Sequence, residues 1–202
     1  MRIAVIGARG TIGKAVTNLL SGKGHEIIGA SRSTQPGINI DDPVSISTFY
    51  NTVEELDGVI CAAGNASFGG IRDLSDRQFQ VGIKSKLMGQ VNLVRYGISH
   101  LNDGGFFVLT SGMLSTRPWP NTSAVAMVNA GLEGFTRAVA LDMPDEKRIC
   151  IVSPPLIKET AEKMRKDSKP WPSADEVAQA YLEAVSGDTN GEVLYVDGYD
   201  VS

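Results

Sequence analysis

The stretch VIGARGTIGKAV, residues 5–16, decides the fold of this 202-residue chain. An apolar run from Ile3 to Ile6 leads into it, and an amphipathic run from Ile12 to Ser21 follows. A strand, a glycine-rich turn and a helix in this order let the backbone approach a pyrophosphate and aim the amino end of the helix at it. We therefore expect a dinucleotide-binding loop made of Gly7, Arg9, Gly10, Thr11, Ile12 and Gly13.

The rest of the chain alternates short apolar runs with longer amphipathic ones. Strands are expected at Ile3–Ile6, Glu26–Ala30, Ile38–Ile40, Gly58–Cys61, Phe106–Thr110, Arg148–Val152 and Val193–Val196. Helices are expected at Ile12–Ser21, Pro43–Val53, Ser75–Ser99, Val125–Asp142 and Ala174–Ser186. This alternation predicts one α/β domain over residues 1–202, a doubly wound parallel sheet of about seven strands with helices on both faces, which is a Rossmann fold.

Composition excludes several classes of function. With 19 Lys and Arg against 23 Asp and Glu, the net charge is −4, which disfavours nucleic-acid binding. Two cysteines and two histidines make a metal site improbable and suit a reducing cytoplasm. Because no apolar run approaches about 18 residues, no membrane association is expected. Residues 158–172, KETAEKMRKDSKPWP, resemble a short lid beside the sheet, where Met164 and Trp171 are candidates for an apolar pocket or for packing under the loop.

The end of the second strand indicates which dinucleotide is bound. Sites for NAD commonly carry an acid here that holds the ribose 2′-hydroxyl. This chain has Ser31 and Arg32 instead, and Arg9 stands in the glycine loop. Guanidinium groups suit a 2′-phosphate, so NADP(H) is predicted over NAD(H). The alternative is that both arginines are solvated surface residues.

Several further motifs resemble those of the short-chain dehydrogenase/reductase family, from Arg2 to about Asp197. INIDDPVSI places Asn39 and Ile40 where the family contacts adenine, with an amide in place of the usual acid. CAAGNA, with Ala62, Ala63 and Gly64, is similar to the Asn-Asn-Ala-Gly motif, and VLTSG places Ser111 at the catalytic serine. IVSPPLIKET resembles the turn beside the nicotinamide, with Pro154, Pro155 and Ile157, and GEVLYVDG resembles the last strand.

The chain departs from the family at its central acid–base residues. Laid on the family's helix, NAGLEGFTRAVAL puts Val125 at the catalytic tyrosine and Asn129 at the lysine. The family's asparagine in the preceding helix falls on Lys86, so lysine and asparagine have exchanged places. Either Lys86 still reaches the cofactor ribose, with Asn129 bonding to it, or it lies on a solvated helix face.

The resemblance implies an NADP(H)-dependent reductase or dehydrogenase of a small carbonyl or alcohol, with hydride chemistry on the nicotinamide and a non-standard proton donor. Ser111 and Lys86 ordering a water, or one of Tyr181, Tyr195 and Tyr199, are the candidate donors, although packing is expected for Tyr181. The competing hypothesis is a non-catalytic NADP(H)-binding regulatory or scaffold protein; an isomerase or epimerase is a third. Small residues at Ala126, Ala130, Gly134 and Ala138 predict a homodimer or higher homo-oligomer.

Overall fold

The computed structural model describes residues 1–144 and 146–199, so residue 145 and the last three residues of the predicted domain lie outside it. Six parallel strands form one sheet in the order β2-β1-β3-β4-β5-β6. They are β1 (Arg2–Ile6), β2 (Glu26–Ala30), β3 (Leu56–Cys61), β4 (Leu101–Thr110), β5 (Arg148–Ser153) and β6 (Val193–Tyr195). The expected doubly wound parallel sheet is thus confirmed, and its strand order reverses at β1, which lies between β2 and β3.

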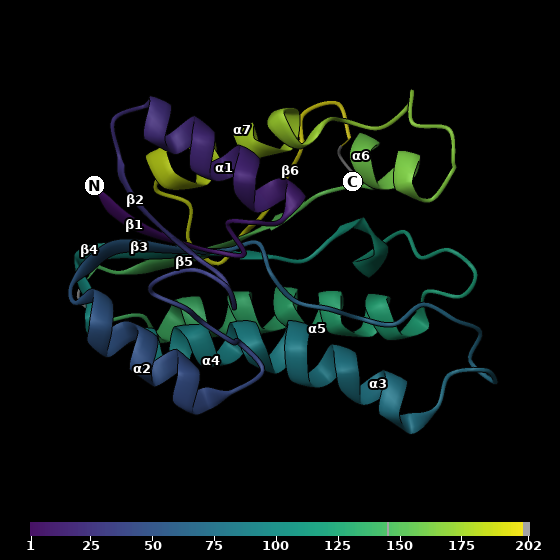
Figure 1. Cartoon of the computed structure of the whole chain (residues 1–202), viewed down its shortest axis with the longest axis horizontal. Helices are drawn as coiled ribbons and strands as arrows, with labels where there is room; N and C mark the ends of the chain where they lie inside the picture. The colour runs from purple at the N-terminus through teal and green to yellow at the C-terminus, as the bar shows by residue number, and fades with distance from the viewer. Residues whose placement is uncertain (145, 200–202) are drawn as a thin grey trace.

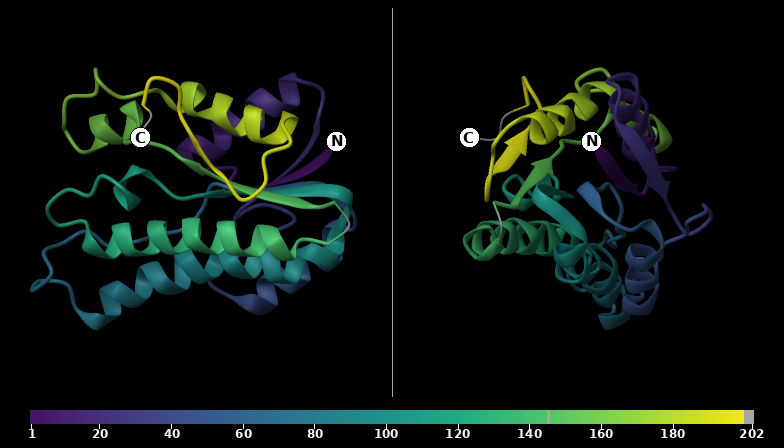
Figure 2. Two further views of the ribbon diagram at one scale, coloured as in Figure 1. Left: turned by 180° about the vertical axis from the view of Figure 1, so that it is seen from behind. Right: turned by 90° about the vertical axis from the view of Figure 1, so that its left-hand side faces the viewer.

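Helices cover both faces of the sheet (Figure 1). On one face lie α1 (Thr11–Gly22) and α7 (Ala174–Ser186), and on the other lie α2 (Pro43–Val53), α4 (Met88–Gly97) and α5 (Ser123–Val139). The views from behind and from the side in Figure 2 show the same three layers, with the sheet between the two groups of helices. Among the described residues, none of these helices is both long and apolar enough to cross a membrane.

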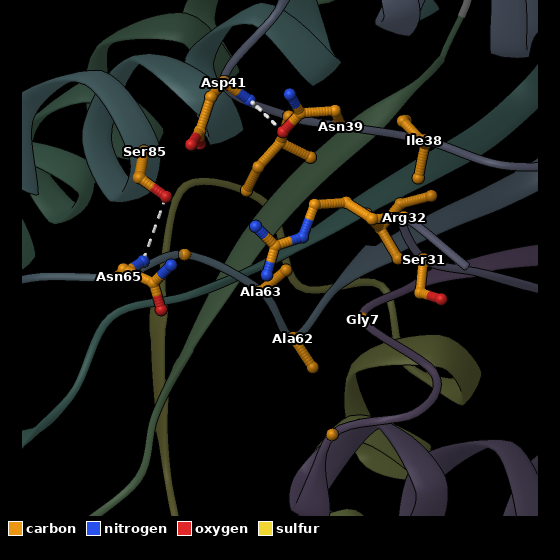
Figure 3. Close-up of a pocket in the computed structure, with 14 residues that line it drawn as sticks. Gly7, Ser31, Arg32, Ile38, Asn39, Asp41, Ala62, Ala63, Asn65 and Ser85 are labelled. Atoms are coloured by element: carbon orange, nitrogen blue, oxygen red, sulfur yellow. Dashed lines mark hydrogen bonds between the residues drawn. The ribbon is translucent and has the colours of Figure 1, made fainter. Parts of the chain in front are cut away.

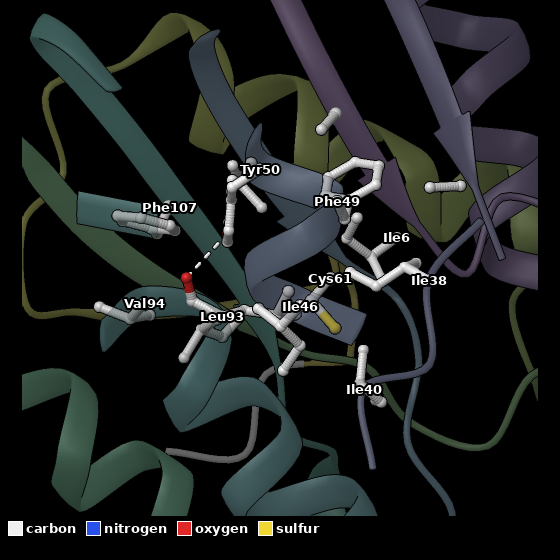
Figure 4. Close-up of a cluster of buried hydrophobic side chains, with 14 of the residues drawn as sticks. Ile6, Ile38, Ile40, Ile46, Phe49, Tyr50, Cys61, Leu93, Val94 and Phe107 are labelled. Carbon is white, nitrogen blue, oxygen red and sulfur yellow. Dashed lines mark hydrogen bonds between the residues drawn. The ribbon is translucent and has the colours of Figure 1, made fainter. Parts of the chain in front are cut away.

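Each layer of helices has its own apolar core against the sheet. In the core beneath α2 and α4, Phe49 and Tyr50 are almost fully buried, and the Tyr50 hydroxyl donates a 2.8 Å hydrogen bond to the carbonyl oxygen of Leu93 (Figure 4). The second core joins α1 and α7 to the opposite face and contains Val16, Leu20 and Tyr181. These near-continuous apolar strands are typical of sheets buried on both sides.

The predicted strand at Ile38–Ile40 is wrong. Only an isolated bridge between Ser31 and Gly37 extends β2, and the Ile38 amide donates to the Ser31 carbonyl oxygen at 2.9 Å. The chain then turns into α2, where the Asp42 amide donates to the carbonyl oxygen of Asn39. The two isoleucines alternate because both side chains are buried in the core, not because they pair in a ladder.

Two other predicted segments are subdivided. The helix expected at Ser75–Ser99 consists of α3 (Asp76–Gly82), a π-helical turn (Ile83–Leu87) and α4, followed by a 3-10 turn (Ile98–His100). The excursion expected at 158–172 begins with a short helix, α6 (Lys158–Lys163), whose Ala161 is fully buried. At its far end the Trp171 ring lies 5.9 Å from the ring of Trp119, between centroids, so the excursion contacts the loop that follows β4.

Candidate active site

A cavity of about 310 Å³ opens at the carboxyl ends of β1, β2 and β3 (Figure 3). This is the point where the strand order reverses, the usual place for a ligand in an open α/β sheet. Predicted site residues that line it are Gly7, Gly10, Ser31, Arg32, Asn39, Ile40, Ala62, Ala63 and Gly64. The sequence analysis missed Ile6, Ile38, Asp41, Asn65 and Ser85, which complete the lining. Asn65 directly follows the CAAG motif, so its position carried a usable signal.

The glycine loop forms the floor of this cavity beside the amino end of α1. Gly7 has φ +89°, and a Cβ atom there would lie 2.6 Å from the Ala62 carbonyl oxygen, so only glycine fits between β1 and the end of β3. The helix begins after Gly10 with no acidic residue in its first turn and no side-chain cap on its amide groups. Those amides and the positive end of the helix dipole are therefore available to an anion.

The rim at the end of β2 carries cationic and hydroxyl groups. The Arg32 side chain extends across the cavity toward Ala63 and Asn65 (Figure 3). Arg9 lies on the outer side of the rim, where its guanidinium donates to the Ser33 hydroxyl at 3.0 Å. The Ser33 hydroxyl is 3.4 Å from that of Ser31, so the structure joins Arg9 to Ser31 through a residue that the sequence analysis did not name.

The opposite wall comes from the turn into α2. The Asn39 side-chain oxygen accepts from the Asp41 amide at 3.3 Å, which holds Asn39 in a local turn, as Figure 3 shows. Asp41 places the cavity's only carboxylate among the described lining residues on this wall, away from the end of β2. From the adjoining π-helical turn, Ser85 accepts from the Asn65 amide at 3.1 Å.

The predicted catalytic residues meet at the turn after β4. The Lys86 ammonium, carried by the π-helical turn, donates to the Ser111 carbonyl oxygen at 3.0 Å. Burial lowers the pKa of Lys86 to about 8, because an ammonium loses its hydration there. Asn129 of α5 donates from its side-chain nitrogen to the next carbonyl oxygen, that of Gly112, at 3.2 Å. Lys86 and Asn129 thus hold consecutive peptide groups, and π-helical turns often mark functional positions.

Two buried residues of α5, Val125 and Asn129, bear on the chemistry of this site. Val125 is 7% exposed, and its side chain has no proton to donate. Asn129 is 2% exposed, and its side-chain oxygen has no hydrogen-bond partner among the described residues. A buried polar atom without a partner is costly, so this oxygen marks a place for a donor group of a ligand.

The Ser111 hydroxyl has a partner that the sequence analysis did not find. It donates to the carboxylate of Glu133 at 2.9 Å, and Glu133 is 5% exposed. Glu133 follows Asn129 by four residues on the same face of α5. The spacing carried a signal, because residues 125, 129 and 133 are four apart and so share one face of the predicted helix.

Several other candidates lie outside the main cavity. Thr11 is close to the excursion at residues 158–172, with its hydroxyl oxygen 3.5 Å from the Lys163 ammonium nitrogen. Ile12 and Gly13 belong to the first turn of α1, and Ile157 packs in the core between that helix layer and the sheet. The Pro154 carbonyl oxygen accepts from the Met113 amide, tying the end of β5 to the Ser111 turn.

The candidate tyrosine donors lie elsewhere. Tyr181 is fully buried, and its hydroxyl is 2.6 Å from that of Thr110, so its expected packing role holds. Tyr195 and Tyr199 line a separate hollow beside α7. Among the described residues, no group of three or more histidine, cysteine, aspartate and glutamate side chains is arranged to hold a metal ion.

Comparison with known families places this geometry in context. Residues 38–198 match the family described as "Enoyl-(Acyl carrier protein) reductase". Versicolorin reductase stcU of Emericella nidulans is 28% identical over 126 residues, which cover 59% of this chain and 48% of that protein. The chain therefore spans about half the length of that curated relative. Carbonyl reductase family member 4 of Danio rerio is 27% identical, with 98% of this chain and 97% of that protein covered.

Solved structures extend the likeness to the whole fold. The protein lin1944 of Listeria innocua is 35% identical, with a TM-score of 0.91 over 97% of this chain and 99% of that one. A small-chain dehydrogenase crystallised in complex with NADPH is 28% identical, with a TM-score of 0.88 over 98% of this chain and 97% of that one. The matched region covers almost all of both neighbours, so the likeness extends over their whole folds.

Proposed function

Because this chain belongs to the short-chain dehydrogenase/reductase family, we propose that it is an NADP(H)-dependent oxidoreductase that transfers hydride between the cofactor and a small carbonyl or alcohol. The observation that carries this proposal is the cavity at the ends of β1, β2 and β3, with a helix amino end on one side and Arg32 across it. When bound, the cofactor supplies the hydride.

The residues present fit such a cofactor. The free amides at the start of α1 suit the pyrophosphate, and the unpartnered oxygen of Asn129 suits a hydroxyl of the nicotinamide ribose. At the end of β2, residues 31–34 are Ser-Arg-Ser-Thr, which supply hydroxyls and a cation without a carboxylate. This set favours a 2′-phosphate through charge-assisted hydrogen bonds, and a neighbouring structure was crystallised with NADPH. We assign Gly7, Gly10, Ser31, Arg32 and Asn129 to cofactor binding.

Substrate chemistry is assigned to the turn after β4. Lys86 holds the Ser111 carbonyl oxygen, and together with Asn129 it fixes the turn that presents the Ser111 hydroxyl. Val125 removes the family's proton donor, a change that typically slows proton transfer by about 10²–10⁴-fold. The proton must therefore come from a different group.

A second function remains a candidate because of Val125. A chain that binds NADP(H) and has lost its proton donor could serve as a regulatory or scaffold protein. The direct discriminator is turnover: NADPH should be consumed with at least one member of a panel of aldehydes, ketones and quinones, and less so by Ser111→Ala. NADPH binding without turnover on any member would favour the regulatory protein.

Cofactor choice is tested by binding. Wild-type protein should bind NADPH at least ten times more tightly than NADH in calorimetry, and Arg32→Asp should remove most of this preference. A matched Arg95→Asp variant, in the last turn of α4 and outside the residues that line the cavity, should keep the preference. Equal affinities of the wild type for the two cofactors would refute the assignment.

We also propose that two or more copies associate through α5. Its outer face exposes Met127, 43% accessible, together with the small residues Ala130, Gly134 and Ala138. Small residues allow close approach of a second helix, and Met127 adds apolar area. The two free cysteines, both buried, suit the cytoplasm that we propose as the compartment.

A further inference from the structure

Glu133 is a buried carboxyl group in the middle of the catalytic region. It lies on α5, two turns after Val125, and is 5% exposed. Among the described residues it forms no ion pair with lysine, arginine or histidine. A carboxylate without a counter-ion in such a place is costly unless hydrogen bonds compensate for its lost hydration.

Three serine hydroxyls provide this compensation from three different parts of the chain. Ser111 follows β4, Ser115 belongs to the 3-10 turn Met113–Ser115, and Ser153 ends β5. Their hydroxyl oxygens lie 2.9, 2.6 and 3.5 Å from the same carboxylate oxygen of Glu133. Glu133 thus joins α5 to both strand ends that frame the substrate side of the cleft.

This arrangement determines what the Ser111 hydroxyl can do. The hydroxyl has one proton, and when Glu133 is ionised that proton points at the carboxylate. Ser111 then offers only lone pairs to the cleft, which suits acceptance of a proton from a substrate alcohol. When Glu133 carries a proton, it can donate to Ser111, and the Ser111 proton becomes free to point at a substrate carbonyl oxygen.

We propose that Glu133 and Ser111 form the proton relay that replaces the family's tyrosine. The relay rests on the proposed oxidoreductase function. In reduction, the electron pair and hydrogen from the reduced nicotinamide form a C–H bond at the substrate carbonyl carbon, and the C=O π pair moves to oxygen. That oxygen takes the Ser111 proton, and Ser111 takes the Glu133 proton. Oxidation of an alcohol runs through the same atoms in reverse.

Exchange with solvent completes the cycle. Ser115 contacts the same carboxylate oxygen and is only half-buried, whereas Ser111 and Ser153 are buried. Ser115 therefore provides the contact through which Glu133 regains its proton. Lys86 also faces this turn, through its bond to the Ser111 carbonyl oxygen.

The test replaces the carboxyl group of Glu133 by a carboxamide of nearly the same size. Glu133→Gln keeps the size of the side chain and a hydrogen-bond acceptor but cannot pass a proton. We expect NADPH affinity within twofold of wild type and carbonyl reduction slowed by about 10²–10⁴-fold. Glu133→Asp should recover part of the rate, and the matched variant Glu183→Gln, at an exposed position of α7, should change it less than twofold.

Two outcomes overturn the relay. One is a Glu133→Gln enzyme with the wild-type rate; the other is a slower Glu133→Gln enzyme whose rate Glu133→Asp does not recover, which would mean that Glu133 only supports the fold. A second readout does not need turnover: the infrared spectrum of the NADP⁺ complex should contain a band of the Glu133 carboxyl group that Glu133→Gln removes and Ser111→Ala shifts. If the wild type binds NADPH but reduces nothing, the proposed function fails; absence of the band overturns the relay separately.

Discussion

Gly13 offers the sharpest test of how the glycine loop works. A Cβ atom at this position would lie 2.1 Å from the Gly7 carbonyl oxygen and 2.7 Å from its carbonyl carbon. Both are backbone atoms that cannot rotate away. To reach an ordinary contact distance, α1 must move away from the loop by about an ångström, since real Cβ contacts rarely fall below 3.0 Å. Gly13→Ala therefore separates the amino end of α1 from the cavity.

Overpacking of this kind typically costs about 1–3 kcal/mol in unfolding free energy. For a chain of this size, each kcal/mol lowers the melting temperature by about 2–4 °C. We expect calorimetry to show at least a tenfold loss in NADPH affinity as well, because the α1 amides no longer meet the pyrophosphate.

The control is Gly22→Ala at the other end of the same helix, where a Cβ atom would meet nothing within 4 Å. That variant should bind NADPH normally and gain up to about 1 kcal/mol of stability. Wild-type stability and NADPH affinity in Gly13→Ala would refute the close approach of helix and loop.

Three further predictions follow from buried or exposed side chains. Burial lowers the pKa of Lys86 to about 8, from 10.5 in the unfolded chain, so the unfolded state binds more protons between these two pH values. The free energy of unfolding should therefore rise with pH in this range, by at most about 1.4 kcal/mol per pH unit. Chemical denaturation of Lys86→Met should lack this rise, and an identical pH dependence in both proteins would contradict the burial of Lys86. Tyr181→Phe removes the bond to the Thr110 hydroxyl and should cost about 1 kcal/mol in denaturant unfolding, with turnover unchanged; a lost turnover would restore Tyr181 as a proton-donor candidate. Met127→Asp should shift the protein toward monomer in sedimentation, and an unaltered oligomer would place the interface elsewhere.

The hydrophobic pattern of the sequence predicted those helices and strands whose form depends on neighbouring residues in the chain. The apolar run from Ile3 to Ile6 and the amphipathic run from Ile12 to Ser21 predicted β1 and α1 to within one residue at each end. The segment around Ile38 failed because burial of alternate side chains does not require a ladder. Two isoleucines can alternate against a core while the chain turns, and the sequence pattern is the same in both cases.

The candidate site was predictable only in part for the same reason. Motifs located Lys86, Ser111 and Asn129, but not the adjacent carbonyl groups that Lys86 and Asn129 bond. Glu133 and Ser153 are 20 residues apart in sequence, and their meeting depends on how α5 packs over the end of β5. The π-helical turn that carries Lys86 has no composition signal of its own, since its residues also suit an ordinary helix.

The two bonds to the Ser111 and Gly112 carbonyl oxygens have a consequence for engineering and for evolution. Restoring a lysine at residue 129 would bring a second ammonium beside the one already supplied by Lys86, and the two would repel in a site that has lost much of its water. We therefore expect substitutions at residues 86 and 129 to depend on each other: Asn129→Lys should be tolerated better together with Lys86→Asn than alone.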